Sequence, residues 1–234
     1  FKKAADQGNA DAQFNLGVVY QNGYGVQKDS KQALVWYKKA ADQGNSEAQS
    51  NLGIMYENGL SVQKDIKQAV EWYKKAADQG NAIAQLNLGS MYYKGEGVQK
   101  DIKQAAQWFK KAADQGNAIA QINLGNMYYN GEGVQKDIQK AVELFKKSAD
   151  QGYANAQSNL ALMYYNGEGV QKDYKQAVEW FKKSANQGNA DAQFNLGNMY
   201  IYGKGVQKDY KQAAYWFSLS CNGGLKEACL MLKN

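Results

Sequence analysis

The feature that most constrains the fold is a short glycine-rich segment that returns at a fixed interval along the chain. The segment reads Gly-x-Gly-Val-Gln-Lys-Asp, and one copy is degraded after its first glycine. Its copies begin at Gly23, Gly59 (the degraded copy), Gly95, Gly131, Gly167 and Gly203. Successive starts are 36 residues apart (for example 131 − 95 = 36). A fixed period in the range of about 20–50 residues is typical of solenoids, in which each unit packs mainly on its neighbours.

Each unit contains the signals of two helices joined by a short loop, as residues 81–116 illustrate. Asn81 can cap a first helix with its side-chain oxygen, and Gly95 can end that helix at positive φ. Asp101 can cap a second helix, which Gly116 would end. The first helix carries an apolar stripe at helical spacing: Ala84, Leu88, Met91 and Tyr92. The second carries another: Ile102, Ala105, Ala106, Phe109, Ala112 and Ala113.

The period therefore predicts an all-α array of antiparallel helix pairs. Six full units span 9–44, 45–80, 81–116, 117–152, 153–188 and 189–224. Residues 1–8 match the end of a preceding unit, and 225–234 match the first helix of a seventh. The chain is thus expected to be part of a longer array, and its cellular compartment, cytoplasmic or secreted, stays open.

A glycine recurs inside the first helix, where it destabilises a helix by roughly 1 kcal/mol relative to alanine. It stands at Gly17, Gly53, Gly89, Gly125 and Gly197, with Ala161 at the same place in the fifth unit. We expect a neighbouring helix to approach so closely here that a larger side chain would be excluded.

The motifs of one unit together resemble the Sel1-like repeat, a branch of the tetratricopeptide superfamily. The resemblance rests on Ala-Gln-x-Asn-Leu-Gly-x-Met-Tyr, on the glycine loop and on Ala-x-x-Trp-Phe-x-Lys-Ala-Ala, and it covers essentially the whole chain. It implies a right-handed α-solenoid superhelix with a concave groove. It also implies an adaptor role in protein complexes, often in bacteria.

Composition narrows the classes of function. The net charge is +6, yet all 28 basic residues are lysine, and histidine is absent. Without arginine or histidine, the chain lacks the side chains best suited to reading nucleic-acid bases, binding metals and general base catalysis. No apolar run approaches the roughly 18 residues of a membrane-spanning helix. The sequence therefore predicts no enzyme, cofactor, metal site, nucleic-acid binding or membrane insertion.

Three positions of the first helix vary between copies although their neighbours do not. In the first unit they are Phe14, Val18 and Gln21; in the fourth, Ile122, Asn126 and Tyr129. Their +4 and +3 spacing puts them on one face, which we expect to lie opposite the packing stripe. A surface that meets a non-repetitive partner should vary in this way. In the family the same face lines the concave groove.

An asparagine beside this face is invariant: Asn15, Asn51, Asn87, Asn123, Asn159 and Asn195. Asparagine donates and accepts hydrogen bonds, so this ladder could hold the backbone of an extended peptide. Alternatively, each asparagine bonds a neighbouring helix and belongs to the framework. The candidate peptide-binding residues are Asn87, Tyr93, Asn123, Asn126, Tyr129, Asn159, Leu162, Tyr165, Asn195 and Asn198.

The two cysteines, Cys221 and Cys229, are eight residues apart and would join a second helix to the following first helix. In the secreted, cysteine-rich branch of the family, disulfides join these two positions in each repeat. Here the other repeats carry glutamine at the second position, so such a bond would occur once. The alternative is a pair of buried free thiols.

The sequence as a whole indicates a scaffold that binds a protein or extended peptide on its groove face. The alternative is a structural array that self-associates end to end. That alternative follows from Phe1, Ala4 and Ala5, which would form an uncovered apolar face on the first, incomplete helix pair.

Overall fold

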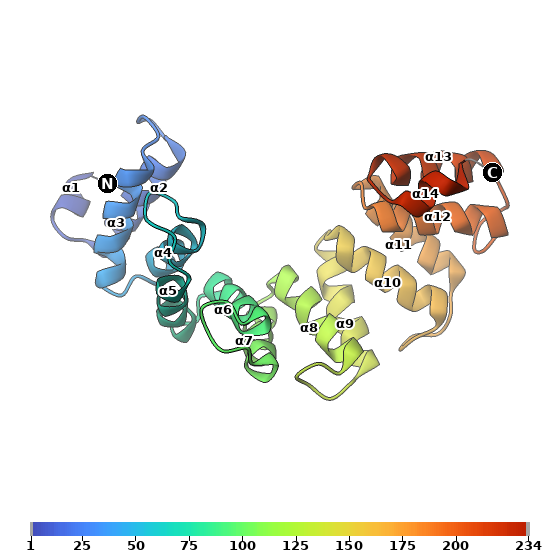
Figure 1. The fold of residues 1–234 in the computed structure, drawn as a ribbon, viewed down its shortest axis with the longest axis horizontal. Helices are drawn as coiled ribbons and strands as arrows, with labels where there is room; N and C mark the ends of the chain where they lie inside the picture. The colour runs from blue at the N-terminus through green and yellow to red at the C-terminus, as the bar shows by residue number, and fades with distance from the viewer. Residues whose placement is uncertain (1, 233–234) are drawn as a thin grey trace. The chain divides into compact units, whose positions relative to one another are not determined.

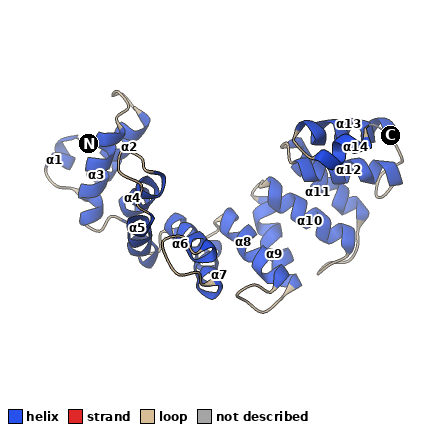
Figure 2. Ribbon diagram, viewed as in Figure 1, coloured by secondary structure: helices blue, strands red, loops and turns tan. Residues whose placement is uncertain are grey.

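The computed structural model describes residues 2–232, and every regular element in that range is a helix (Figure 2). The chain divides into two compact units, residues 1–117 and 118–234, each of which is described by itself.

The first unit contains helices α1 to α7 (Figure 1). Their bounds are α1 Lys2–Asp6, α2 Ala10–Asn22, α3 Ser30–Asp42, α4 Ser46–Asn58, α5 Ile66–Asp78, α6 Ala82–Lys94 and α7 Ile102–Asp114. Helices α2 and α3, α4 and α5, and α6 and α7 form the predicted pairs, and α3 and α5 also pack on the first helix of the next pair.

The second unit contains helices α8 to α14. Their bounds are α8 Ala118–Asn130, α9 Ile138–Asp150, α10 Ala154–Asn166, α11 Tyr174–Asn186, α12 Ala190–Tyr202, α13 Tyr210–Asn222 and α14 Lys226–Met231. The helices pair as in the first unit, so the prediction of an all-α array of 36-residue helix pairs is confirmed.

The predicted capping residues determine where the helices begin and end. Asn81 Oδ1 accepts a hydrogen bond from the Ala84 amide at 2.9 Å, and Asp101 Oδ1 accepts one from the Gln104 amide at 2.9 Å. Gly95 follows α6 in the left-handed conformation, with φ of 76°. These caps satisfy backbone groups that a helix end leaves unpaired.

The recurring glycine of the first helix lies against an aromatic ring. A Cβ atom on Gly125 would lie 2.7 Å from Phe145 Cε1, and a Cβ on Gly53 would lie 2.4 Å from Tyr73 Cε1. The expectation of a close contact is therefore confirmed. The contact is made by the second helix of the same repeat, through its fully buried aromatic side chain.

Within each of the two units, a buried glutamine links a full repeat to the one before it. Gln157 Nε2 donates to the Ala149 carbonyl of the preceding repeat at 3.2 Å, and Gln157 Oε1 accepts from Gln187 Nε2 at 2.8 Å. The bond to the preceding carbonyl recurs at Gln13, Gln49, Gln85 and Gln193. Because these side chains are about 5% exposed or less, their pairing is required for stability.

The two cysteines form a disulfide bond, with 4.8 Å between their Cα atoms. Cys221 and Cys229 lie 36 residues after Ala185 and Gln193 respectively (185 + 36 and 193 + 36). The disulfide therefore occupies the place at which the preceding repeat has its glutamine-to-carbonyl hydrogen bond. At the junction before it, Gly223 stands 36 residues after Gln187, so Gln193 lacks the second glutamine and its Oε1 is buried without a hydrogen-bond partner.

The predicted apolar face at the start of the chain is only partly present. Ala4 is exposed, but Ala5 is 1% exposed and packs against Ala12, Leu16 and Trp36 of the first full repeat. Phe1 lies outside the described residues. The expectation that Ala5 contributes to an uncovered face was wrong, because α1 already packs on α2.

Replacing Gly125 with leucine should destabilise the second unit, because the new side chain would overlap the ring of Phe145. Overpacking of this kind usually costs about 1–3 kcal/mol, and a clash with a buried ring belongs at the upper end. Thermal unfolding is the measurement. Asn130→Leu, at an exposed position of the same helix, is the control; equal melting temperatures for the two variants would contradict the packing assignment.

Removing the disulfide in Cys221→Ala/Cys229→Ala should free α14, with a loss of roughly 2–4 kcal/mol. Cys221→Ala/Cys229→Gln should recover about 1 kcal/mol, because the introduced glutamine can repeat the hydrogen bond of the other repeats. Hydrogen exchange of the α14 amides measures both effects. Indistinguishable exchange in the two variants would show that the sites are not equivalent.

Candidate functional site

The variable positions of the first helix do not all face away from the core. Ser50 and Ser158 are buried, and the ring of Phe14 lies 5.9 Å from the ring of Tyr37 on the second helix. The first of the three positions therefore belongs to the packing interface, and placing it opposite the stripe was wrong. The ring contact with Tyr37 shows that this position faces the second helix of the same pair. The other two positions are half-buried or exposed.

At the third variable position, the identity of the residue depends on whether the second helix of the same repeat provides a tyrosine or a phenylalanine. In the first two repeats the second-helix ring is a tyrosine: Tyr37 donates to Gln21, and Tyr73 donates to Glu57 Oε2 at 2.6 Å. Burial raises the pKa of Tyr37 to about 12. In the third to fifth repeats the second-helix ring is phenylalanine, and the first helix supplies the tyrosine instead: Tyr93, Tyr129 and Tyr165.

In the second unit these first-helix tyrosines bond to the glycine loop of the following repeat. Tyr129 Oη donates to Glu168 Oε2 at 2.8 Å, and this bond raises the pKa of Tyr129. Tyr165 Oη accepts from Lys204 Nζ at 2.6 Å, and Lys204 also lies 4.7 Å from the centre of the Tyr165 ring. Both rings also pack against the core. The expectation that this position lies on a face opposite the packing stripe was therefore wrong for Tyr129 and Tyr165.

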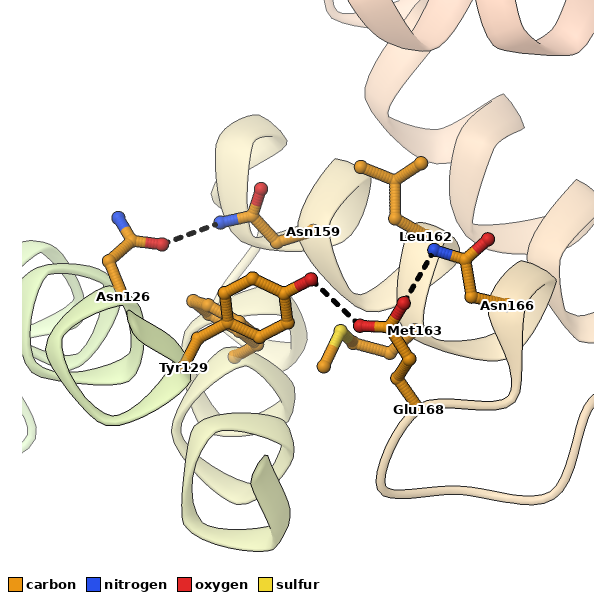
Figure 3. A pocket seen from close by; sticks show the side chains of 8 residues that line it. Asn126, Tyr129, Asn159, Leu162, Met163, Asn166 and Glu168 are labelled. Carbon is orange, nitrogen blue, oxygen red and sulfur yellow. Dashed lines mark hydrogen bonds between the residues drawn. The ribbon is translucent and has the colours of Figure 1, made fainter. Parts of the chain in front are cut away.

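Two tyrosine-walled pockets lie on this face of the second unit. The first has a volume of about 150 Å³ and lies between α8 and α10 (Figure 3). The residues that line it are Asn126, Tyr129, Phe145, Asn159, Leu162, Met163, Asn166 and Glu168. Figure 3 shows the Asn126 and Asn159 amides on one side of the Tyr129 ring and the Glu168 carboxylate at its hydroxyl.

The second pocket repeats the first one 36 residues further on, with a volume of about 320 Å³. The residues that line it are Leu162, Tyr165, Asn166, Phe181, Asn195, Asn198 and Tyr202. Six of them are the equivalents of residues in the first pocket (for example 129 + 36 = 165 and 145 + 36 = 181). The two pockets are therefore copies of one design, and they share Leu162 and Asn166.

Seven of the ten predicted residues line these pockets. They are Asn126, Tyr129, Asn159, Leu162, Tyr165, Asn195 and Asn198. Asn123 is half-buried in α8 and lines neither pocket. Asn87 and Tyr93 belong to the first unit, where Tyr93 is 38% exposed.

The asparagine ladder has different partners along the chain. In the first unit, Asn51 and Asn87 lie against the hydroxyls of Tyr37 and Tyr73 in the preceding repeat, as the framework alternative predicts. In the second unit, Asn159 Nδ2 donates to Asn126 Oδ1 at 3.4 Å. The side chain of Asn195, among the described residues, has no hydrogen bond within the protein.

Sequence reasoning missed the contribution of the loops and the second helices. Phe145 and Phe181 line the pockets from second helices, and Glu168 and Lys204 come from the loops. The signal for the loop residues was present, because the residue between the two loop glycines differs between copies.

A further pocket of about 380 Å³ lies in the first unit beside the glycine loop of the third repeat. The residues that line it are Lys74, Tyr92, Val98, Gln99, Lys100, Asp101 and Gln104. Most of these are framework positions that hardly change between repeats, so this pocket offers little means of distinguishing one partner from another.

Residues 2–232 contain neither a metal-binding cluster nor a membrane-spanning helix. In that range, histidine, cysteine and acidic side chains form no group of three that could hold a metal ion. None of the helices described there combines the length and the apolar character needed to cross a bilayer.

The Sel1 repeat family model matches almost the entire chain, at residues 1–9, 10–45, 46–81, 82–117, 118–153, 154–189 and 190–225. The chain belongs to the Sel1 repeat family. The matched segments begin one residue later than the units predicted above, and each full segment still contains the same two helices.

Solved structures agree with this assignment. A protective antigen present in uropathogenic Escherichia coli strains is 41% identical, with a TM-score of 0.92 over 99% of this chain and 50% of that one. A Sel1 repeat protein from Oxalobacter formigenes is 38% identical, with a TM-score of 0.81 over 92% of this chain and 86% of that one. This chain thus spans about half the length of the E. coli antigen. A comparison with curated protein sequences found no significant match.

Replacing Glu168 with glutamine should lower the pKa of Tyr129, because the negatively charged carboxylate that accepts the hydrogen bond of its hydroxyl disfavours the phenolate. An NMR titration that follows the Tyr129 ring carbon bearing the hydroxyl measures the shift. Glu179→Gln, on an exposed position of α11, is the matched control. A Tyr129 pKa that moves equally in both variants would refute the contact.

Proposed function

We propose that this Sel1 repeat protein is a scaffold that binds a partner protein through an extended peptide segment, which lies across the two equivalent pockets of residues 118–234. Sel1 repeat proteins are generally protein-interaction scaffolds. The observation that carries the proposal for this chain is the repetition of one pocket design at a 36-residue interval. An extended peptide is itself a repeating ligand, so successive side chains can enter successive pockets.

The chemistry of the pocket walls supports a peptide ligand. Each pocket has a phenylalanine ring from the second helix and a tyrosine from the first, which together offer apolar surface for a side chain. The amides of Asn195 and Asn198 line the second pocket without internal hydrogen bonds among the described residues. An asparagine side chain can accept from a peptide N–H and donate to a peptide carbonyl at once.

The variation between repeats supports the same proposal. Helix caps, buried glutamines and ring-facing glycines are nearly identical from copy to copy, whereas the pocket position of Asn126 is Leu162 and Asn198 in the next two repeats. That position is exposed at Asn126 and Leu162 and half-buried at Asn198, so core packing does not dictate its side chain. The pockets thus share an architecture but differ in preference, as expected for recognition of a non-repetitive sequence.

Tyr129→Ala/Tyr165→Ala should abolish peptide binding. Aromatic anchors at interfaces often contribute about 2 kcal/mol or more each, so the loss of two should weaken binding roughly thousandfold. The probe is a set of 12-residue peptides selected from a random display library on the purified chain. Fluorescence anisotropy with the selected peptides measures Kd for each variant.

Tyr210→Ala/Tyr215→Ala is the matched control, because both tyrosines are more than half exposed on the second helix α13, away from the pockets. Tyr129 and Tyr165 also pack on the core, so their loss should lower the melting temperature. Asn195→Ala/Asn198→Ala therefore provides a second test, since it breaks no internal hydrogen bond recorded for the described residues. Selected peptides that bind all pocket variants as tightly as the parent would overturn the proposal.

A further inference from the structure

The residue between the two loop glycines changes its charge along the array. In successive repeats it is Tyr24, Leu60, Glu96, Glu132, Glu168 and Lys204. In the second unit, Glu168 lines the first pocket, and Lys204 bonds to Tyr165, which lines the second. Two pockets of one architecture thus carry opposite charges.

At the first pocket the charge is a carboxylate. Glu168 lines the pocket; its Oε2 accepts from Tyr129 Oη at 2.8 Å, and its Oε1 accepts from Asn166 Nδ2 at 3.0 Å (Figure 3). Both donors are neutral, so they orient the carboxylate without neutralising its charge. No lysine within residues 2–232 forms an ion pair with Glu168.

At the second pocket the charge is an ammonium group. Lys204 Nζ donates to Tyr165 Oη at 2.6 Å and lies 4.7 and 5.5 Å from the ring centres of Tyr165 and Tyr174. Lys204 does not itself line the second pocket, but it is bonded to Tyr165, which lines that pocket together with Asn195 and Asn198. Within the described residues no carboxylate pairs with it, so its charge is also uncompensated.

The distance between the pockets suits a short peptide. Helices α8 and α10 are joined by the hydrogen bond between Asn159 and Asn126, and a helix with its side chains is about 10–12 Å across, so neighbouring pockets lie about that far apart. An extended chain rises about 3.3 Å per residue, so about three residues separate side chains that enter neighbouring pockets.

We propose that the paired pockets select a peptide segment that carries a lysine or arginine at the Glu168 pocket and an aspartate or glutamate about three residues away at the Lys204 pocket. This inference rests on the proposed peptide-binding function and specifies its ligand. The tyrosines provide contact area common to both pockets, and the loop residues decide which charge each accepts. Charge complementarity of this kind fixes the register and rejects peptides with the opposite order of charges.

The experiment selects 12-residue peptides from a random display library on the native chain and on Lys204→Glu. Peptides selected on the native chain should be enriched in one basic and one acidic residue two to four positions apart. Those selected on Lys204→Glu should be enriched in two basic residues at that spacing. The Lys204 position is the better one to reverse, because Glu168 also orients Tyr129 and Asn166.

A double-mutant cycle then identifies the contact. Changing the acidic residue of a native-selected peptide to glutamine should weaken its binding to the native chain roughly tenfold, as expected for a charge-assisted bond at a partly solvated site. The same change should have no effect on binding to Lys204→Gln. Lys208→Gln, an exposed lysine of the same loop, is the control and should behave like the native chain.

The outcomes separate this inference from the function on which it rests. Peptides that depend on Tyr129 and Tyr165 but show no charge preference, or the same preference on Lys204→Glu, would overturn the charge assignment and leave the peptide site intact. Peptides that bind independently of both tyrosines would overturn both. A charge preference that reverses with Lys204 would support both.

Discussion

Within each unit, the buried glutamine between successive full repeats is the interaction on which the stacking depends. A helix pair of this size has one apolar stripe per helix and gains stability only by stacking on its neighbours. Stacking through alanine and leucine alone would allow the pairs to slide. A glutamine such as Gln157 prevents this, because its amide must meet the Ala149 carbonyl and the Gln187 amide at the same time. A buried amide that missed either partner would cost about 1–3 kcal/mol, so the register is determined at every junction where both bonds form.

At its last junction the second unit meets the same requirement by different chemistry. The disulfide between Cys221 and Cys229 joins the two backbone positions that Ala185 and Gln193 join one repeat earlier. A covalent bond there needs no glutamine amide. Gly223 belongs to the junction before it, where it replaces the second glutamine and leaves Gln193 with only its bond to Ala185. The exchange indicates that the distance between these backbones is set by helix packing, and that the glutamine and the disulfide are two means of fastening one geometry.

Because the framework fixes the register, the remaining first-helix positions are free to differ. They do so in correlated ways: where the second helix provides Tyr37 or Tyr73, the first helix provides an acceptor, and where it provides phenylalanine, the first helix in the middle repeats provides the tyrosine. In the repeats where the first helix provides Tyr129 or Tyr165, the tyrosine hydroxyl group lies beside the glycine loop of the next repeat. It connects the residue between the loop glycines to the pocket, so that one loop substitution, Glu168 to Lys204 between repeats, changes the charge that a ligand meets.

The sequence by itself determined the all-α architecture, the helix ends and the 36-residue frame, because caps, stripes and glycines act within one repeat and recur in every copy. It also identified five pocket residues from their variation between copies, and two more, Asn159 and Asn195, from an invariant asparagine beside the variable face. The tertiary structure decided what depends on contacts between repeats. It showed that the position of Phe14, Ser50 and Ser158 faces the core. It showed that the two cysteines form a disulfide bond. It also showed that Phe145, Glu168 and Lys204 lie beside the first-helix tyrosines. Those residues come from different helices and loops, and the spacing within one helix carries no information about which of them meet across a junction.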